Sequence, residues 1–316
     1  MKSHAICFTL LTTVAISIAA SFPAQAQRAR VFVSVNGNDA NPCTAQSPCK
    51  TFQHAHDVVL AGGEISVLDT GGYGPVTITK SVSIVSVLGQ ASVLASTNGF
   101  GITINGGATD TINLTGLIIE GAGANGTVGV VFHSGGSLTV ENCIIRQLNA
   151  GGISFNPNSS SALSVSNTII ADIPFNEGIF VFGTASNIAI KAVVNNVQLY
   201  NLSSGLTSDG RGNPGGSINI SIADSAVNNS SGGFQVVWEA PSAPVSVAVA
   251  RSTIANNSVG LFANGANATI RVAGSTISGN TSGWSTFSGG IILSAGNNTI
   301  EGNLDGNPPP PTYVMK

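Results

Sequence analysis

Apolar and polar residues alternate in short segments along most of the chain, and many of these segments begin with glycine. Residues 152–156 read GISFN and residues 260–264 read GLFAN. Alternation with period two is typical of a β-strand that buries one face. Equivalent segments begin, at intervals of 23 to 28 residues, at Gly101, Gly129, Gly152, Gly178, Gly205, Gly233, Gly260 and Gly283. Similarity at such a period predicts a stacked repeat array.

A second series of residues runs in step with the glycines and marks another corner of each repeat. Its members are Gly116, Asn142, Asn167, Asn196, Asp224, Arg251, Gly274 and Asn297. Asparagine tolerates the left-handed conformation, and stacked amides can hydrogen-bond along an axis. Each repeat then holds three very short strands, which find their hydrogen-bond partners in the next repeat. The sequence predicts an all-β fold, a parallel β-helix of about 8–10 coils with strands about 4.8 Å apart.

The repeated glycines have a physical reason in such a coil. Glycine is expected where the chain turns sharply into a strand, often with positive φ, and where a side chain would collide with the next coil. The residue after each glycine should point inward, and the second and fourth residues outward. Leucine-rich repeats and calcium-binding rolls fit less well, because their fixed leucines and G-G-x-G-x-D copies are missing. An all-β sandwich is a minor alternative.

The first 26 residues are expected to be a signal peptide. Lys2 and His4 precede an apolar run from Ile6 to Ala20, and the segment ends in FPAQAQ. A basic start, a short apolar middle and small residues at the exit predict a secretory signal cleaved after Ala26. The run is too short for a comfortable membrane span, so we expect a secreted or periplasmic protein without a membrane span.

The next segment, residues 27–63, is predicted to close the N-terminal end of the coils. Cys43 and Cys49 bracket TAQSP, close enough for a disulfide in an oxidising compartment. Residues 51–61 have apolar residues on one helical face, which predicts an N-terminal capping helix. The β-helix is then expected over 64–304, followed by a proline-rich tail over 305–316 that cannot add a strand. Cys143 is interpreted as a small buried residue.

Composition narrows the possible partners. Charged residues make up 8% of the chain and the net charge is −3. No basic stripe is present, so nucleic acid is an unfavourable partner. Abundant, evenly spaced Ile, Val and Leu argue against disorder despite the 39 glycines.

The stretch PCKTFQHAHDVVLAGGEISVLDTGGYGPVTITKSVSIVS and the coils after it carry a resemblance. They are similar to the right-handed parallel β-helix superfamily, the pectate-lyase-like proteins, over about residues 31–304. The opening also resembles the N-terminal caps of secreted, surface-displayed bacterial β-helix proteins. The resemblance implies the fold, whereas this scaffold hosts lyases, hydrolases, esterases and adhesive proteins alike.

The resemblance also implies where to look for chemistry, because family enzymes that cut acidic polysaccharides place their site on or beside the outer surface of one sheet. On the glycine-led strands, Asp209, Arg211 and Glu239 form the one charged cluster that the pattern predicts. A surface ion pair is the alternative interpretation of these residues. A hydrolase would need two or three neighbouring carboxylates, and a calcium-assisted lyase several acidic ligands with an Arg or Lys base.

Histidines give weaker candidates. His133 is expected between Asn105 and Asn156 in the stack, without a partner that would make it a general base. His54 and His56 lie two apart in the predicted helix, so they do not share a face and no metal site is expected.

Exposed aromatic residues suggest binding instead. Four phenylalanines are assigned to outward positions, together with the amides Asn105 and Asn156. They are Phe180, Phe182, Phe262 and Phe287. Flat apolar rings can stack on sugars, or they can be covered by loops.

Two functions therefore compete. The first is a non-catalytic, secreted β-helix for surface display, adhesion or contact with a polysaccharide or cell-surface glycan, with no cofactor and no metal. The alternative is a polysaccharide lyase or glycoside hydrolase acting on an acidic polysaccharide such as pectin. A subunit of an oligomeric fibre is a third interpretation of the same pattern.

Overall fold

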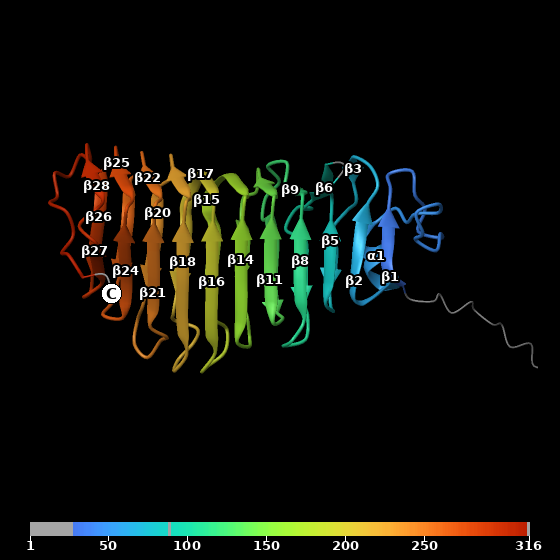
Figure 1. Ribbon diagram of the computed structural model, residues 1–316, viewed down its shortest axis with the longest axis horizontal. Coiled ribbons are helices and arrows are strands. Elements are labelled where there is room, and N and C mark those ends of the chain that lie inside the picture. Colours follow the sequence, from blue (N-terminus) through green and yellow to red (C-terminus); the bar gives the residue numbers. More distant parts are fainter. Residues whose placement is uncertain (1–27, 88–89, 315–316) are drawn as a thin grey trace, which may run out of the picture.

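Short strands stack side by side along one long axis, each on the equivalent strand of the neighbouring coil (Figure 1). The computed structural model describes residues 28–87 and 90–314, so the predicted signal at 1–26 lies outside the described residues. The strand pairings within this part of the chain are parallel, as in Ile153 beside Ile179 and Val165 beside Val194. The predicted parallel β-helix is confirmed. Within the described ranges, no helix is long and apolar enough to cross a membrane.

One face of the solenoid is an 11-stranded sheet, which runs the length of the molecule in Figure 1. Its eleven stacked strands are separated by ten turns of the chain, in agreement with the prediction. In order they are β1 (Arg28–Val33), β2 (Val59–Val67), β5 (Val82–Val85), β8 (Thr111–Thr115), β11 (Ser137–Glu141), β14 (Ser161–Ser166), β16 (Ala189–Asn195), β18 (Ser217–Ala223), β21 (Val245–Ala250), β24 (Ala268–Ala273) and β27 (Ile291–Ser294).

A 17-stranded sheet supplies the other two faces, because it bends where β15 (Ile169–Phe182) and β17 (Gln198–Asp209) cross a corner without a break. Its short-strand face also contains β3 (Gly71–Gly72), β6 (Ala91–Leu94), β9 (Leu117–Glu120), β12 (Ile144–Arg146), β19 (Ala226–Asn228), β22 (Thr253–Ala255), β25 (Thr276–Ser278) and β28 (Thr299–Glu301). The third face, called here the glycine-led face, also contains β4 (Val76–Ile78), β7 (Phe100–Asn105), β10 (Val128–Ser134), β13 (Gly151–Phe155), β20 (Gly232–Val237), β23 (Val259–Asn264) and β26 (Ser282–Phe287).

Side chains from the three faces fill the interior of the coil. The residue after each of the first seven repeated glycines is buried, as predicted, from Ile102 at 0% exposure to Leu261 at 0%. Trp284, in the last glycine-led strand, is only partly buried against the core. The alternation of buried and exposed positions thus supplies one continuous hydrophobic core along the axis.

The repeated glycines are required by the close approach of the next coil. A Cβ on Gly233 would lie 2.1 Å from the carbonyl oxygen of Gly260, and a Cβ on Gly152 would lie 2.4 Å from that of Gly178. The predicted collision is therefore confirmed. The predicted positive φ is wrong for these glycines, because none of the eight adopts it. They enter the strand in ordinary extended backbone, and space alone excludes a side chain.

Left-handed residues do occur at the two corners that flank the short strands. Asn142, Asn167, Asn196, Asp224 and Arg251 have φ between 47° and 53°, which confirms the predicted second corner. The side-chain Nδ2 of Asn196 donates to Asn167 Oδ1 at 2.8 Å. Arg251 continues the series by pairing with Asp224 at 2.7 Å on the exposed surface.

The sequence pattern did not reveal that the third corner is left-handed too. Its residues have φ between 50° and 57° and occupy equivalent places in successive coils; they are Gln147, Asp172, Asn201, Asn229 and Asn256. The side-chain Nδ2 of Asn201 donates to Asp172 Oδ1 at 2.9 Å. Asparagine is favoured here for the same conformational reason as at the second corner.

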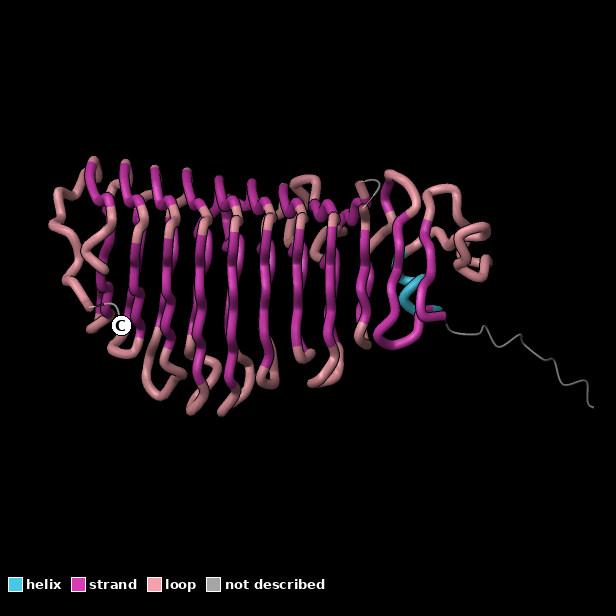
Figure 2. The backbone as a smooth tube through the Cα atoms, in the orientation of Figure 1, coloured by secondary structure: helices cyan, strands magenta, loops and turns pink. Residues whose placement is uncertain are grey.

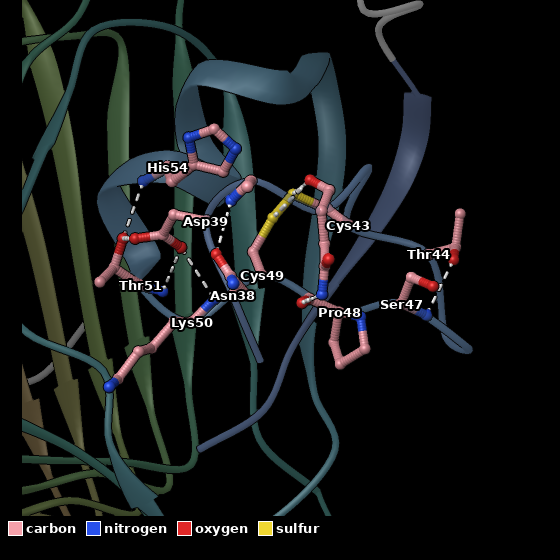
Figure 3. The surroundings of a disulfide bond; sticks show 12 residues. Asn38, Asp39, Cys43, Thr44, Ser47, Pro48, Cys49, Lys50, Thr51 and His54 are labelled. Atoms are coloured by element: carbon pink, nitrogen blue, oxygen red, sulfur yellow. Dashed lines mark hydrogen bonds between the residues drawn. A yellow bond between two sulfur atoms is a disulfide. The ribbon is translucent and has the colours of Figure 1, made fainter. Parts of the chain in front are cut away.

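The disulfide Cys43–Cys49 is present at the N-terminal end, as expected (Figure 3). Its loop bonds to β1, the outermost strand of its sheet: Phe32 donates to the Cys43 carbonyl at 2.9 Å, and the Cys49 amide donates to Phe32 at 3.0 Å. The loop thereby pairs an edge that would otherwise expose unpaired backbone groups.

The helix α1 (Phe52–Val58) lies among the first strands and is shorter than the predicted 51–61 (Figure 2). Thr51 begins it by accepting a hydrogen bond from the His54 amide at 3.2 Å. Gln53 accepts from the Thr77 amide at 2.8 Å and the buried His56 from the Thr79 amide at 3.2 Å. The helix thus bonds to the chain at β4; its role as a cap stays a prediction.

Within its described residues, 305–314, the proline-rich tail forms no strand, but it is bonded to the last coil. The Trp284 indole donates to the Pro308 carbonyl at 2.9 Å, Ser282 Oγ donates to Asp305 at 2.7 Å, and Ser294 bridges to Thr312. These contacts cover part of the final coil with extended chain.

We expect Gly233→Ala to lower the free energy of unfolding by about 2–3 kcal/mol, because the new methyl group must displace the backbone of the next coil. Gly72→Ala is the matched control: this glycine also lies in a strand, and its Cβ would meet nothing nearer than Ser92 Oγ at 3.5 Å. Its effect should stay within about 0.5 kcal/mol. Urea denaturation measures both; equal losses would contradict the spacing argument.

Candidate functional site

The outward side chains of the glycine-led face stand in two straight columns. In the first column, neighbours in the register are Thr103, Val131, Ser154, Phe180, Thr207, Gln235, Phe262 and Ser285. The second column runs through Phe182, Asp209, Val237, Asn264 and Phe287. Residues some two dozen positions apart in sequence thus lie one strand spacing apart, about 4.8 Å.

Two of the predicted aromatic residues form a pair on this face. The rings of Phe180 and Phe182 lie 5.8 Å apart with an angle of 10° between their planes, and both are half-buried. Phe262 is also half-buried, three strands further along, while Phe287 is 66% exposed near the C-terminal end. The face therefore offers flat rings at two places, about 14 Å apart along the axis at ~4.8 Å per strand.

Asp209 is brought together with Arg211, but it is not exposed as expected. Arg211 Nε and Nη2 lie 2.9 Å and 2.6 Å from Asp209 Oδ2, and the Arg211 amide donates to Oδ1 at 2.9 Å. Only 5% of the Asp209 side chain is exposed, against 55% for Arg211. The carboxylate of Asp209, whose register neighbours are Phe182 and Val237, is covered because Arg211 folds back over it. What this pair presents to the surface is the guanidinium.

Glu239 completes the predicted cluster around a cavity. The cavity has a volume of about 300 Å³ and is lined by Arg211, Val237, Trp238, Glu239, Ala240, Asn264, Gly265 and Ser288. Hydrogen bonding and charge from Asp209 raise the pKa of Arg211, and Glu239 adds a smaller effect in the same direction. We call it the Arg211 cavity; it holds one fixed cation beside one exposed carboxylate.

The loops that follow β17, β20, β23 and β26 form the walls of the Arg211 cavity. Residues 183–188, 210–216 and 238–244 extend furthest along the lower edge of the solenoid in Figure 2. Trp238 was missing from the predicted site; its indole donates to the Ser242 carbonyl at 3.0 Å, which holds the ring against its own loop. Its place directly after a glycine-led strand is the signal that could have identified it.

His133 is exposed, but it does not stand beside Asn105 as predicted. The register shifts after Phe132, so that Asn105 pairs with Ser134. The rings of His133 and Phe100 instead form a T-shaped pair, with 6.5 Å between centroids. The extra residue of this irregularity displaces the column by one position, a change that composition cannot reveal.

The two amides predicted for binding differ in their surroundings. Asn105 is exposed. Asn156 is half-buried and donates to Ser154 Oγ at 2.9 Å, while its Oδ1 is buried without a hydrogen-bond partner in the described part of the chain.

One group of potential metal ligands occurs among the described residues, namely Cys43, Cys49 and His54 within 4.8 Å of one another. The two sulfurs are bonded to each other, so this group supplies no thiolate (Figure 3). The Nε2 of His56, two residues further along the helix, accepts a hydrogen bond from the Thr79 backbone N–H.

Cys143 is a buried free thiol at the second corner. Its Sγ contacts the Glu141 carbonyl oxygen at 3.2 Å, and it occupies the interior beside Thr168 of the next coil, whose Oγ1 accepts from the Cys143 amide at 3.3 Å. Burial raises the pKa of the Cys143 thiol to about 11. A protonated, buried thiol is a poor nucleophile.

Comparisons with known proteins agree with this architecture. No protein-family model matches the sequence, and no curated protein matches it. Among solved structures, the chain is similar to pectate lyase Pel9A, with a TM-score of 0.61 and 16% identity over 92% of this chain and 78% of that one. It therefore has a right-handed, pectate-lyase-like parallel β-helix fold.

Two further structures give lower scores. The A-module of the mannuronan C-5 epimerase AlgE4 of Azotobacter vinelandii has a TM-score of 0.45 and 12% identity, over 81% of this chain and 91% of that one. An alginate lyase from Paenibacillus sp. has a TM-score of 0.41 and 14% identity, over 90% and 98%.

We expect Cys143 to resist a thiol reagent such as Ellman's reagent at pH 8 in the folded protein, because the thiol is covered and protonated. The measurement uses protein lacking residues 1–26, in which Cys143 is the remaining free thiol. Release of one thiol equivalent in denaturant is the control. Rapid stoichiometric reaction without denaturant would contradict the structural role.

Asp209→Asn should lower the free energy of unfolding by about 1–2 kcal/mol, because it removes a charge-assisted, buried partner of Arg211. Asp224→Asn is the matched control, since it breaks a similarly short pair with Arg251 that is exposed on both sides. Its cost should be much smaller than that of Asp209→Asn, because solvent screens the exposed pair. Thermal unfolding distinguishes the two; equal shifts would contradict the difference in burial.

Proposed function

We propose that this chain is an exported β-helix protein that binds a glycan on the glycine-led face without cleaving it, in surface display or adhesion. The proposal rests mainly on one observation. The carboxylate that the register places on this face, Asp209, is buried and bonded to Arg211, whereas aromatic rings and amides remain accessible beside it. Rings with neighbouring amides suit the faces and hydroxyl groups of sugars.

Several observations argue for contact with an extended ligand. The outward columns continue over consecutive strands, so one polymer chain lying along the axis would meet Phe180 and Phe182, then Gln235, then Phe262. The Arg211 cavity lies beside the same strands and offers a guanidinium to an anionic group. The similarity of the chain's fold to that of a pectate lyase supports carbohydrate as the class of ligand. Export rests on the signal predicted over residues 1–26.

Catalysis on an acidic polysaccharide such as pectin is the second candidate. It is favoured by the exposed Glu239 beside Arg211. In this pairing the Glu239 carboxylate would accept a proton, and the Arg211 guanidinium would bind a uronate carboxylate. A hydrolase would need a second carboxylate acting with Glu239. Asp209 could serve only after Arg211 had moved away from both of its oxygens.

The first experiment measures binding. Purified protein is screened on a glycan array and the best ligand is titrated by calorimetry. We expect the double substitution Phe180→Ala/Phe182→Ala to weaken binding about tenfold or more, because each ring contributes roughly 0.5–1.5 kcal/mol of stacking. Val193→Ala, which removes an exposed side chain from the 11-stranded sheet, should leave affinity unchanged. Unchanged binding in the double variant would overturn the assignment of this face.

The same ligands test for turnover, by absorbance of unsaturated products for a lyase and by reducing ends for a hydrolase. We expect no product. Product formation that is lost in Glu239→Gln but kept in Val193→Ala would replace the binding function by the catalytic one.

A further inference from the structure

A second, larger cavity lies on the opposite side of the glycine-led face from the Arg211 cavity. Its volume is about 480 Å³, and its main lining residues are Gln147, Leu148, Asn149, Asp172, Pro174 and Phe175. These residues belong to the corner at which the chain passes from the short-strand face into the glycine-led strands. The Arg211 cavity is built by the loops at the other end of those strands. We call the larger one the Phe175 cavity.

An insertion in β15 gives this cavity its aromatic wall. Ile173 pairs with Leu202 and Glu177 pairs with Ser204, so three residues of β15 oppose the single Ser203 of β17. This bulge turns Pro174 and Phe175 outward, and Phe175 is 72% exposed. Bulges commonly redirect a side chain beside a functional site.

The bulge is held at both ends. Ile173 is fully buried in the core. The side-chain Nδ2 of Asn176 donates to the backbone carbonyl of Asn149 in the preceding coil at 3.2 Å. Pro174 restricts the backbone before Phe175. The ring is therefore presented from a fixed loop, which lowers the entropic cost of using it as a binding surface.

The polar side chains beside the Phe175 ring differ in how many hydrogen bonds they already make within the protein. Asn149 is occupied, since its Oδ1 accepts from the Gly126 amide at 2.8 Å and its Nδ2 donates to Asn125 at 3.2 Å. Asp172 accepts one bond, from Asn201. The Gln147 carboxamide has no hydrogen-bond partner within residues 28–87 and 90–314. Gln147 and Asp172 occupy the same corner position in successive coils, about 4.8 Å apart.

The chemical groups that line the Phe175 cavity indicate a class of ligand. A planar ring beside a carboxylate and a free carboxamide matches a pyranose, whose C–H face stacks and whose hydroxyl groups donate and accept. Asp172 is the one charged residue that lines this cavity. Its charge disfavours a uronate or sulfated sugar, whereas Arg211 favours one at the other cavity.

We propose that the Phe175 cavity is a separate glycan-binding site that prefers a neutral sugar unit to an acidic one. The ring of Phe175 stacks on the sugar, Asp172 accepts from a hydroxyl group, and Gln147 bonds a neighbouring hydroxyl group. This assignment is independent of the function proposed for the columns of Phe180 and Phe182, because the two sites share no side chain.

Calorimetric titration with neutral oligosaccharides, namely cello-, xylo-, manno- and galacto-oligosaccharides, and with oligogalacturonate tests the proposal. We expect at least one neutral ligand to bind and Phe175→Ala to weaken it tenfold or more. Phe175→Trp should keep the affinity and give a change in tryptophan fluorescence on binding. Gln147→Ala should weaken binding about three- to tenfold.

Asp172→Asn keeps the shape of the corner and the bond from Asn201, and it should narrow the preference for neutral over acidic ligands. Phe180→Ala/Phe182→Ala should leave this binding unchanged, so failure of one site is distinguishable from failure of the other. The proposal is overturned if no neutral ligand binds at about 10 mM, a weak-binding limit. Equal affinity of Phe175→Ala and the wild type, or preference for oligogalacturonate at this cavity, would overturn it as well.

Discussion

Backbone hydrogen bonding between successive coils is the constraint on which this structure depends. Most strands here are too short to be stable as isolated hairpins, but each strand away from the two ends of the stack pairs on both sides with an equivalent strand. Such pairing requires every coil to lie at the same small spacing from the next. The glycines that begin one set of strands follow from that spacing, because the carbonyl oxygen of the next coil occupies the space of a side chain.

The same constraint explains the corners and the ends. A chain that turns three times per coil needs residues that accept a left-handed backbone, and asparagine and aspartate provide them at both corners beside the short strands. A stack of parallel strands also has two open edges. At one edge the Cys43–Cys49 loop bonds to β1, and at the other residues 305–313 bond to the last coil.

Function can vary only where the constraint is relaxed. The interior columns are fixed by packing, so chemical variety appears in the outward columns and in the corner segments whose lengths differ from coil to coil. Both cavities arise in this way: the Arg211 cavity from the long loops after β17 and β20, and the Phe175 cavity from the bulge in β15. They lie on opposite sides of one face and differ in charge, because Asp172 is the one charged residue that lines the Phe175 cavity, whereas Arg211 and Glu239 both line the Arg211 cavity.

The sequence by itself determined the repeat, the inward and outward positions, the disulfide and the second corner, because each depends on local alternation or on a residue type that suits one conformation. It also brought Asp209, Arg211 and Glu239 together, since register follows from the period. Tertiary structure alone decided that Asp209 is covered by Arg211, that His133 leaves its column, and that Phe175 borders a cavity. Those outcomes depend on side-chain rotamers, on single inserted residues and on loops folding back across neighbouring coils, none of which leaves a periodic trace in the chain.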